Sequence, residues 1–238
     1  MKKSWMELVM ALLLIAGAYQ ISKEGARVVS QRKADQAVVV LDAGHGGSDP
    51  GKIGVNGEKE KDINLQITLL LKKKLEKKKV YVILTRNSDE GLYDSGSKNK
   101  KVQDLQNRVD LIHAKKPDCV VSVHQNSYTS PEVKGAQVFY FTHSAEGKKL
   151  AEGLQNSLVE DVDPENHRLA KGNTSYYLLK KTDAPAAIVE CGFLSNPDEA
   201  KLLKSKDYQN KLADSICRGI LEYIKTDKKS GKSQKTIT

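Results

Sequence analysis

The sequence predicts an α/β fold: a single domain with a mostly parallel central sheet, flanked by helices on both faces. At 238 residues the chain is long enough for one sizeable domain and too short for two ordinary domains joined by a linker. Its hydrophobic fraction of 39% and charged fraction of 29% exclude wholesale disorder and a multi-span membrane protein. Short apolar runs alternate with longer amphipathic segments, an order typical of a parallel sheet covered on both faces.

Buried strands are predicted where runs rich in Val and Ile are bounded by Gly, Pro, Asp or Asn. These runs are 37–41, 80–84, 119–123, 136–141 and 186–189. Between them lie segments with apolar residues at helical spacing, namely 63–75, 102–113, 145–159 and 208–224. Two polar stretches containing glycine, 89–101 and 164–175, are expected to be irregular loops.

The two ends of the chain differ from the part between them, which sets the expected catalytic domain at 37–225. Lys2 and Lys3 precede an apolar run over 8–18, which is short of the roughly 20 residues of a spanning helix but suits a signal peptide. We therefore expect 1–36 to be a signal peptide or N-terminal membrane anchor plus linker, with any anchoring through 1–20. Residues 226–238 contain little to bury and are expected to form a disordered basic tail.

This N-terminal pattern predicts export across the cytoplasmic membrane to the cell envelope, with the protein either secreted or membrane-anchored. Ala16-Gly17-Ala18 offers a small-x-small cleavage site, but the sequence leaves open whether the segment is removed.

The net charge of +9 comes mainly from lysines that are spread along the chain without interleaved aromatic residues. Nucleic-acid binders usually concentrate arginine and aromatic residues on one face, so we expect no nucleic-acid partner. An acidic cell-envelope polymer is compatible with the same charge.

Three cysteines, Cys119, Cys191 and Cys217, have no CxxC spacing and form an odd set. Cys119 lies in a predicted strand and Cys217 in a predicted helix, so we expect buried free thiols.

Polar residues follow three of the predicted strands, at the edge where an open parallel sheet forms its ligand crevice. His45 follows the first strand within a glycine-rich loop, His124 follows the strand 119–123, and Glu190 follows the strand 186–189. The loop around His45 lacks the GK[ST] ending of a P-loop and the GxGxxG spacing, which argues against phosphate binding. Two histidines and a glutamate at one edge form the His₂Glu set that catalytic zinc uses with an open fourth position.

Glu58, Glu60 and Glu190 are the carboxylate candidates. Glu58 and Glu60 both stand just before a predicted helix, where solvated acidic residues are also common, and spacing alone does not choose between them. Glu190 directly follows a buried strand, so its charge is costly unless a positive group lies near. It suits a catalytic role, taking a proton from an attacking water and returning it to a leaving amine. The alternative is an ion pair with a basic residue such as Arg168.

Four segments together resemble the zinc-dependent N-acetylmuramoyl-L-alanine amidases of bacterial cell-wall hydrolysis. They are Val40-Leu-Asp-Ala-Gly-His45-Gly-Gly, Glu60-Lys-Asp-Ile-Asn-Leu65, Ser122-Val-His124-Gln-Asn126 and Val189-Glu190-Cys-Gly-Phe-Leu-Ser-Asn196, within about 37–225. The resemblance places the family's zinc ligands on His45, Glu60 and His124 and its catalytic glutamate on Glu190. It thereby selects Glu60 over Glu58.

The resemblance implies hydrolysis of the amide between the lactyl group of N-acetylmuramic acid and the L-alanine of the peptidoglycan stem peptide. An export segment followed by one amidase domain looks most like the germination-specific amidases of spore formers. Those enzymes remove stem peptides during synthesis of the spore cortex, so that a deacetylase can then form muramic-δ-lactam, and the resemblance implies a role in sporulation and germination. An activating lipoprotein is a candidate partner.

The resemblance is weaker in the third motif, where Gln125 and Ser127 replace the residues usual in the family. This departure concerns substrate contacts and leaves the metal ligands unaffected. Asn126 and Arg168 are the expected substrate-binding residues, with a bidentate contact from Arg168 to a stem-peptide carboxylate as one role and a structural ion pair as the other. The alternative function for the whole chain is a noncatalytic envelope or peptidoglycan-binding module.

Overall fold

A six-stranded sheet forms the centre of the part of the chain that the structure describes. The structure is a computed structural model that describes residues 36–234, with side chains as far as Thr226. The strands are β1 (Val38–Ala43), β2 (Tyr81–Leu84), β3 (Cys119–Asn126), β4 (Gln137–Phe141), β5 (Lys171–Asn173) and β6 (Ala186–Phe193). The helices are α2 (Glu60–Lys77), α3 (Lys100–Lys115), α4 (Ala145–Asp161), α5 (Tyr177–Lys181), α6 (Pro197–Lys204) and α7 (Lys206–Gln234).

The sheet has the strand order β2-β1-β3-β6-β4-β5 and is mostly parallel, as the sequence predicts. Strands β2, β1, β3 and β6 run in one direction, with Val39 paired to Cys119 and Val120 paired to Ala186. Strand β4 is antiparallel to β6, and β5 follows the direction of β4. Because β4 runs opposite to β6, it starts at the edge at which β1, β3 and β6 end.

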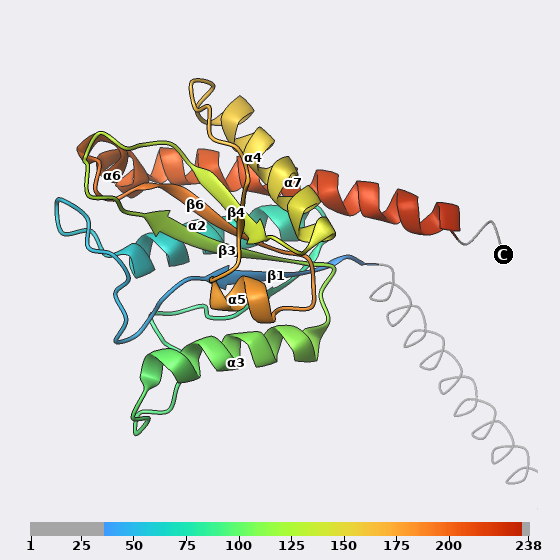
Figure 1. Ribbon diagram of the computed structural model, residues 1–238, viewed down its shortest axis with the longest axis horizontal. Helices are drawn as coiled ribbons and strands as arrows, with labels where there is room; N and C mark the ends of the chain where they lie inside the picture. The colour runs from blue at the N-terminus through green and yellow to red at the C-terminus, as the bar shows by residue number, and fades with distance from the viewer. Residues whose placement is uncertain (1–35, 235–238) are drawn as a thin grey trace, which may run out of the picture. The chain divides into compact units, whose positions relative to one another are not determined.

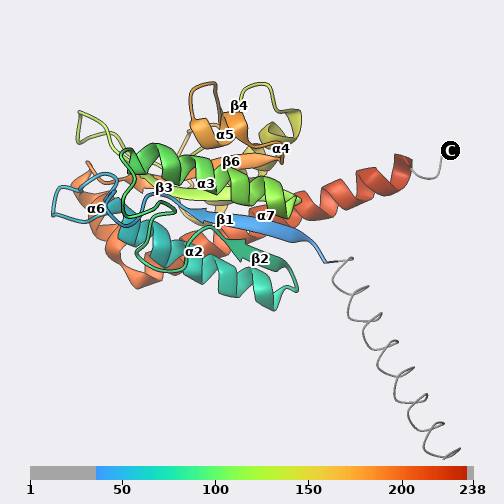
Figure 2. The same ribbon diagram turned by 90° about the horizontal axis from the view of Figure 1, so that it is seen from below.

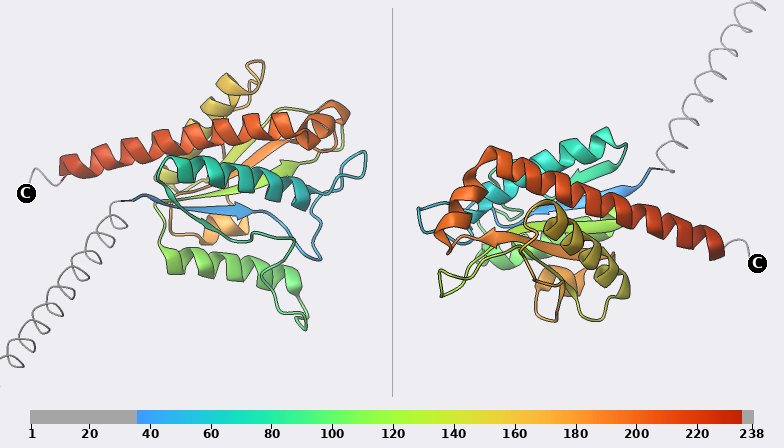
Figure 3. Two further views of the ribbon diagram at one scale, coloured as in Figure 1. Left: turned by 180° about the vertical axis from the view of Figure 1, so that it is seen from behind. Right: turned by 90° about the horizontal axis from the view of Figure 1, so that it is seen from above.

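Helices cover both faces of the sheet (Figure 1). On one face the larger core joins the sheet to α2, α4 and α7, and α7 packs against both α2 and α4 (Figure 3). On the other face a smaller core joins the sheet to α3 and α5, and α3 is the nearer helix in the view from below (Figure 2). Because both faces are covered, the central strands are apolar almost throughout.

Local sequence signals account for where several helices begin. The side chains of Asn99 and Ser144 accept hydrogen bonds from backbone N–H groups in the first turns of α3 and α4. Asn196 does the same for α6, which has Pro197 at its first position. These caps satisfy backbone donors that have no partner within the helix.

The structure confirms the nine long elements that the sequence predicts and adds three short ones. Strands β1, β3 and β6 run beyond their predicted ends, so His124 and Glu190 lie within strands instead of directly after them. Strand β5 lies in a stretch predicted to be loop, and its sequence Lys-Gly-Asn carries no apolar pattern. Helices α5 and α6 span only five and eight residues, too few to show a clear helical period.

The prediction of a disordered tail from residue 226 is wrong up to Gln234, because α7 continues to that residue. Lysine is a good helix former, and a helix already held by packing is extended at little cost. The expected signal peptide or anchor lies outside the described residues, apart from Gln36 at the end of its linker. Within the described residues, no helix is both long enough and apolar enough to span a membrane.

All three cysteines are buried and none forms a disulfide, as expected.

The contact between α4 and α7 generates a prediction about stability. A Cβ added at Gly219 would lie 3.0 Å from the Cα of Leu154, too close for an undisturbed contact. Gly219→Val should therefore lower the free energy of unfolding by about 1–3 kcal/mol, measured by urea denaturation. Gly153→Ala is the matched control, since an added Cβ there meets nothing within 4 Å and should stabilise the helix by about 0.5–1 kcal/mol. An unchanged urea midpoint for Gly219→Val would contradict the tight crossing.

Candidate metal centre

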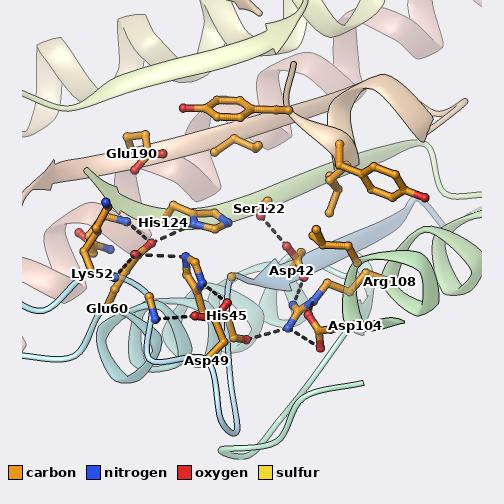
Figure 4. Close-up of a pocket in the computed structure, with 18 of the residues that line it drawn as sticks. Asp42, His45, Asp49, Lys52, Glu60, Asp104, Arg108, Ser122, His124 and Glu190 are labelled. Carbon is orange, nitrogen blue, oxygen red and sulfur yellow. Dashed lines mark hydrogen bonds and ion pairs between the residues drawn. The ribbon is translucent and has the colours of Figure 1, made fainter. Parts of the chain in front are cut away.

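His45, Glu60 and His124 come together at the carboxyl edge of the sheet. They lie in the loop after β1, at the first residue of α2 and within β3, and one ligand atom from each lies within 4.8 Å of the others. His45 Nε2 is 3.2 Å from Glu60 Oε2, and His124 Nδ1 is 2.9 Å from Glu60 Oε1 (Figure 4). Two imidazoles and a carboxylate, each with a donor atom turned to one point, are the donor set of a catalytic zinc site.

The electrostatics of the three residues also fit a cation. Burial alone would raise the pKa of Glu60, but contacts with His124 and His45 hold it well below its ordinary value. Burial alone would lower the pKa of His124, but Glu60 raises it to about 9. The negative charge of Glu60 therefore stabilises positive charge on its neighbours. A divalent ion in the same position would also supply positive charge.

Glycines provide the space that the cluster occupies. A Cβ on Gly44 would lie 2.2 Å from the ring of His124, and one on Gly51 would lie 2.5 Å from Glu60 Oε2. Gly51 also has a positive φ of 69°, which favours glycine. The glycine-rich sequence around His45 thus allows the close approach of the three side chains.

Glu58 lies apart from the cluster, although it is only two residues from Glu60. Its Oε2 accepts a hydrogen bond from the backbone N–H of Asn56 in the loop before α2. Glu60 instead accepts from the backbone N–H groups of Lys52 and Gln125 as well as contacting both histidines. These bonds fix its carboxylate at the first turn of α2, where the helix dipole also favours a negative charge.

Glu190 lies beside the cluster, because it is the cross-strand partner of His124 in the β3–β6 ladder. It is 8% exposed, and its Oε2 has no hydrogen-bond partner among the described residues. Burial raises the pKa of Glu190 to about 7, with His124 acting against this shift and Glu60 adding to it. A carboxyl group with a pKa near neutrality can both accept and return a proton.

Arg168 does not form an ion pair with Glu190 among the described contacts. Its guanidinium donates to the carbonyl of Lys134 and to Oε1 of Gln137, and it lies 5.0 Å from the centre of the Phe193 ring. Gln137 is the partner of Glu190 across β4 and β6. Arg168 is therefore one side chain removed from Glu190.

A buried arginine holds the loop that carries His45. Arg108, on α3, is 1% exposed and pairs with the carboxylates of Asp42 and Asp104. It also donates to the backbone carbonyls of Ala43 and His45. His45 itself has a φ of 62°, an unfavourable conformation for a residue with a side chain, so these bonds hold a strained backbone in place.

A second arginine supports the same loop from another side. Arg86, which follows β2, donates to the carbonyls of Ala43, Gly44 and Lys61. Three successive carbonyls, from Ala43 to His45, thus accept hydrogen bonds from buried guanidinium groups. The Nδ1 atom of His45 is in turn 2.9 Å from a carboxylate oxygen of Asp49, which orients the ring.

The sequence reasoning missed both arginines, Asp42 and Asp49. One signal was available for Arg108, which shares the buried face of α3 with Val109 and Ile112 and so is a charge in an apolar stripe. Asp49 lies four residues from His45, but neither spacing nor composition shows that the two side chains meet. Asp42, like Glu190, is a carboxylate within a buried apolar strand, and the same desolvation argument applies to it.

The cluster faces a cavity of about 460 Å³ that extends along the sheet between α3 and α5. Asn126 lines this cavity with the metal cluster and Glu190, whereas Arg168 does not line it. One wall includes Lys101 and Leu105 of α3, and the other includes Tyr176 and Tyr177. The cavity is large enough for a ligand of several groups and has both apolar and polar walls.

The segment 127–136 crosses from the end of β3 to the start of β4, and its first residue, Ser127, lines the cavity. It is tied to the segment that follows β6 by three hydrogen bonds. The N–H of Tyr128 donates to Ser195 Oγ, the amide of Asn196 donates to the carbonyl of Pro131, and the N–H of Gly135 donates to Glu199.

Comparison with known proteins identifies the family. The family model described as N-acetylmuramoyl-L-alanine amidase matches residues 39–222. The chain belongs to this family. The match contains the whole cluster and Glu190, and the expected amidase activity is therefore confirmed at the level of the family.

Individual relatives agree with this assignment. The germination-specific N-acetylmuramoyl-L-alanine amidase of Bacillus subtilis is 35% identical over 228 residues, covering 94% of this chain and 95% of that protein. The solved structure of the CwlD amidase from Clostridioides difficile, in complex with the GerS lipoprotein, is 39% identical. It superposes with a TM-score of 0.78 over 80% of this chain and 100% of that chain. N-acetylmuramoyl-L-alanine amidase AmiA of Escherichia coli is 28% identical and covers 82% of this chain and 78% of that protein.

The buried pair of Arg108 and Asp42 makes the amidase sensitive to acid. Burial alone would raise the pKa of Asp42, but Arg108, with Ser122 and Thr85, lowers it well below its ordinary value of 3.8. Ionised Asp42 therefore stabilises the fold at neutral pH, and this contribution is lost as the pH falls below about 5 toward the folded-state pKa. Asp42→Asn should lower the free energy of unfolding at pH 7 by about 3–5 kcal/mol and flatten its dependence on pH below 5.

The control is Asp110→Asn, at an exposed position on the same helix as Arg108. It should change the free energy of unfolding at pH 7 by less than about 0.5 kcal/mol. Equal effects of the two substitutions in urea denaturation series at several pH values would refute the role given to Asp42.

Proposed function

We propose that this amidase is a zinc hydrolase that cleaves the amide between the lactyl group of N-acetylmuramic acid and the L-alanine of the peptidoglycan stem peptide. The observation that carries the proposal is the convergence of His45, Glu60 and His124 within 4.8 Å, with Glu190 beside them on β6. The residues fit zinc by donor type, by geometry and by the negative charge of Glu60.

Glu190 acts as the general base and then as the general acid in this proposal. When bound, zinc supplies Lewis-acid chemistry, which polarises the scissile carbonyl and makes water a better nucleophile. Glu190 takes a proton from the attacking water on Oε2, the atom that has no hydrogen-bond partner among the described residues, and returns it to the leaving amine of L-alanine. Its burial beside the cluster keeps that proton out of bulk solvent.

We assign substrate contacts to Asn126 and Arg168. Asn126 lines the cavity at the end of β3, close in sequence to the ligand His124, and its carboxamide can bind the glycan or the peptide next to the scissile amide. Arg168 donates a hydrogen bond to Gln137, and its planar guanidinium group suits a carboxylate of the stem peptide. Its hydrogen bonds to Lys134 and Gln137 use Nε and Nη1, so a carboxylate can bind at Nη2 without displacing either partner.

The biological setting that we propose is the spore cortex of a spore-forming bacterium, after export through the N-terminal segment. The similarity to the germination-specific amidase of Bacillus subtilis supports the setting, since it extends over 94% of the chain. The similarity to CwlD, solved with the GerS lipoprotein, supports a lipoprotein partner for this chain as well.

A noncatalytic peptidoglycan-binding module is the second reading of this fold. It would bind glycan equally well with or without metal, because its positive surface and not the cluster would hold the ligand. The presence of all four expected groups in one cavity favours the hydrolase.

Glu190→Gln should abolish cleavage while leaving the metal site intact. The substitution keeps the size of the side chain but removes the group that accepts the proton, so kcat should fall by about 10²–10⁴. Bound zinc, measured by atomic emission, should stay within about two-fold of the unaltered protein, since Glu190 is not a ligand. Release of stem peptides from peptidoglycan is followed by mass spectrometry, and undiminished release by Glu190→Gln would rule out its role.

Glu60→Ala and Glu58→Ala form a matched pair that tests the carboxylate ligand. Glu60→Ala removes one of three protein ligands and should release nearly all zinc from the purified protein, with loss of activity. Glu58→Ala removes a hydrogen bond to the backbone of Asn56, away from the cluster, and should leave the zinc content unchanged. Equal zinc retention by both variants, in protein that stays folded by circular dichroism, would show that Glu60 is not a ligand.

A further inference from the structure

The edge of the sheet opposite the metal centre is formed by three turns that lie side by side. The N–H of Tyr81 donates to the carbonyl of Ala37, and the N–H of Asp118 donates to the carbonyl of Val38. The N–H of Val120 donates to the carbonyl of Pro185. The carboxyl ends of α2, α3 and α5 therefore lie at the edge of the sheet where β1, β3 and β6 begin (Figure 1).

Positive charge is concentrated on this edge, which we call the amino edge and define as residues 76–79, 115–118 and 180–183. It carries seven lysines against three carboxylates, and all of these residues are exposed. The main loops of the catalytic edge, 44–59, 85–99 and 127–136, carry five basic and six acidic residues. The net positive charge of the protein is thus unevenly placed, with an excess at the amino edge and none in these catalytic-edge loops.

Helix stabilisation explains only part of this excess. Lysines in the last turn of a helix interact favourably with its dipole, which accounts for Lys77 and Lys115. That effect is confined to the last turn, yet Lys79 and Lys116 lie beyond it in left-handed conformations, with φ values of 62° and 47°. Glycine or asparagine is usual at such positions. Lysine there adds charge to the amino edge at a cost in backbone strain.

We propose that the amino edge docks on a bilayer that contains anionic phospholipid. Lysines in three adjacent turns suit a diffuse negative surface, because each ammonium group acts as a point charge and needs no defined partner geometry. The three turns contain neither arginine nor an aromatic residue, which are the groups that usually recognise nucleic-acid phosphates and bases. A bilayer is therefore the better fit among large polyanions.

The sequence before the domain supports the same partner. In the sequence, 18 residues separate the apolar run 8–18 from Ala37. An apolar segment and a basic surface are two signals of the kind that together give stable membrane attachment.

Docking of the amino edge would set the direction in which the cavity faces. The docking proposal does not depend on the proposed function. Strands β1, β3 and β6 have six to eight residues, so the metal cluster lies about 20–25 Å from the amino edge. The cavity would face away from the bilayer and toward the peptidoglycan.

The test uses the full chain with vesicles of phosphatidylcholine alone or of equal parts phosphatidylcholine and phosphatidylglycerol. Amine acylation read by mass spectrometry reports the reactivity of each lysine. Lys77, Lys78, Lys115 and Lys180 should become about five-fold less reactive on the anionic vesicles, the factor that corresponds to about 1 kcal/mol per lysine. Lys98, Lys201, Lys204 and Lys206, which lie in the catalytic-edge loops or near the end of β6, serve as internal controls and should not change. High salt should abolish the protection.

Two sets of variants complete the test. Replacing Lys77, Lys78, Lys115 and Lys180 by glutamine should lower co-sedimentation with anionic vesicles at least five-fold relative to the same replacement at the four control lysines. Both sets should release stem peptides from soluble muropeptides at the unaltered rate, which separates failure of docking from failure of the proposed amidase reaction.

Several results would overturn the proposal. One is equal reactivity of the two lysine groups on anionic vesicles, and another is equal sedimentation of the two variant sets. Protection of the amino edge by soluble polyphosphate, without protection by anionic vesicles, would assign the surface to a soluble polyanion instead.

Discussion

The buried pair of Arg108 and Asp42 is the contact on which the catalytic edge depends. Asp42 is the second-last residue of β1 and stands three residues before the candidate ligand His45, and Arg108 of α3 pairs with it directly. The same guanidinium binds the carbonyls of Ala43 and His45, so one side chain ties the helix, the strand and the loop together. Charges this deeply buried are tolerated only because each has a partner and further hydrogen bonds. The position of His45, the first candidate metal ligand, is thus set by a contact in the interior.

The sheet itself positions the other half of the site. His124 and Glu190 are cross-strand partners, so their separation is fixed by the hydrogen-bonded ladder between β3 and β6. Glu60 is held at the start of α2 by hydrogen bonds from the backbone N–H groups of Lys52 and Gln125. Two of the candidate ligands and the proposed base therefore come from strands and a helix, and only His45 stands on a loop. That loop is the one that two buried arginines hold in place.

The sequence predicted the fold and the cluster well because both follow from local patterns. Apolar runs of strand length and amphipathic segments of helix length show the alternation, and the polar residues at strand ends mark the active edge. Glu60 was different, since its chemistry was indistinguishable from that of Glu58 until the family motif was considered. The support from Arg86, Arg108 and Asp49 was not predicted, because it depends on contacts between residues far apart in the fold or on loop geometry. Short elements such as β5 and α5 were missed because three to five residues cannot display a period.

The reversed direction of β4 divides the catalytic edge into two parts that can change independently. Because β4 starts where β3 and β6 end, the segment 127–136 must bridge this edge, and its bonds to Ser195, Asn196 and Glu199 fasten it to the segment after β6. None of these bonds involves a member of the metal cluster. Insertions or substitutions in the bridge would reshape the entrance to the cavity without moving the ligands. In this architecture substrate preference can diversify while the reaction stays constant.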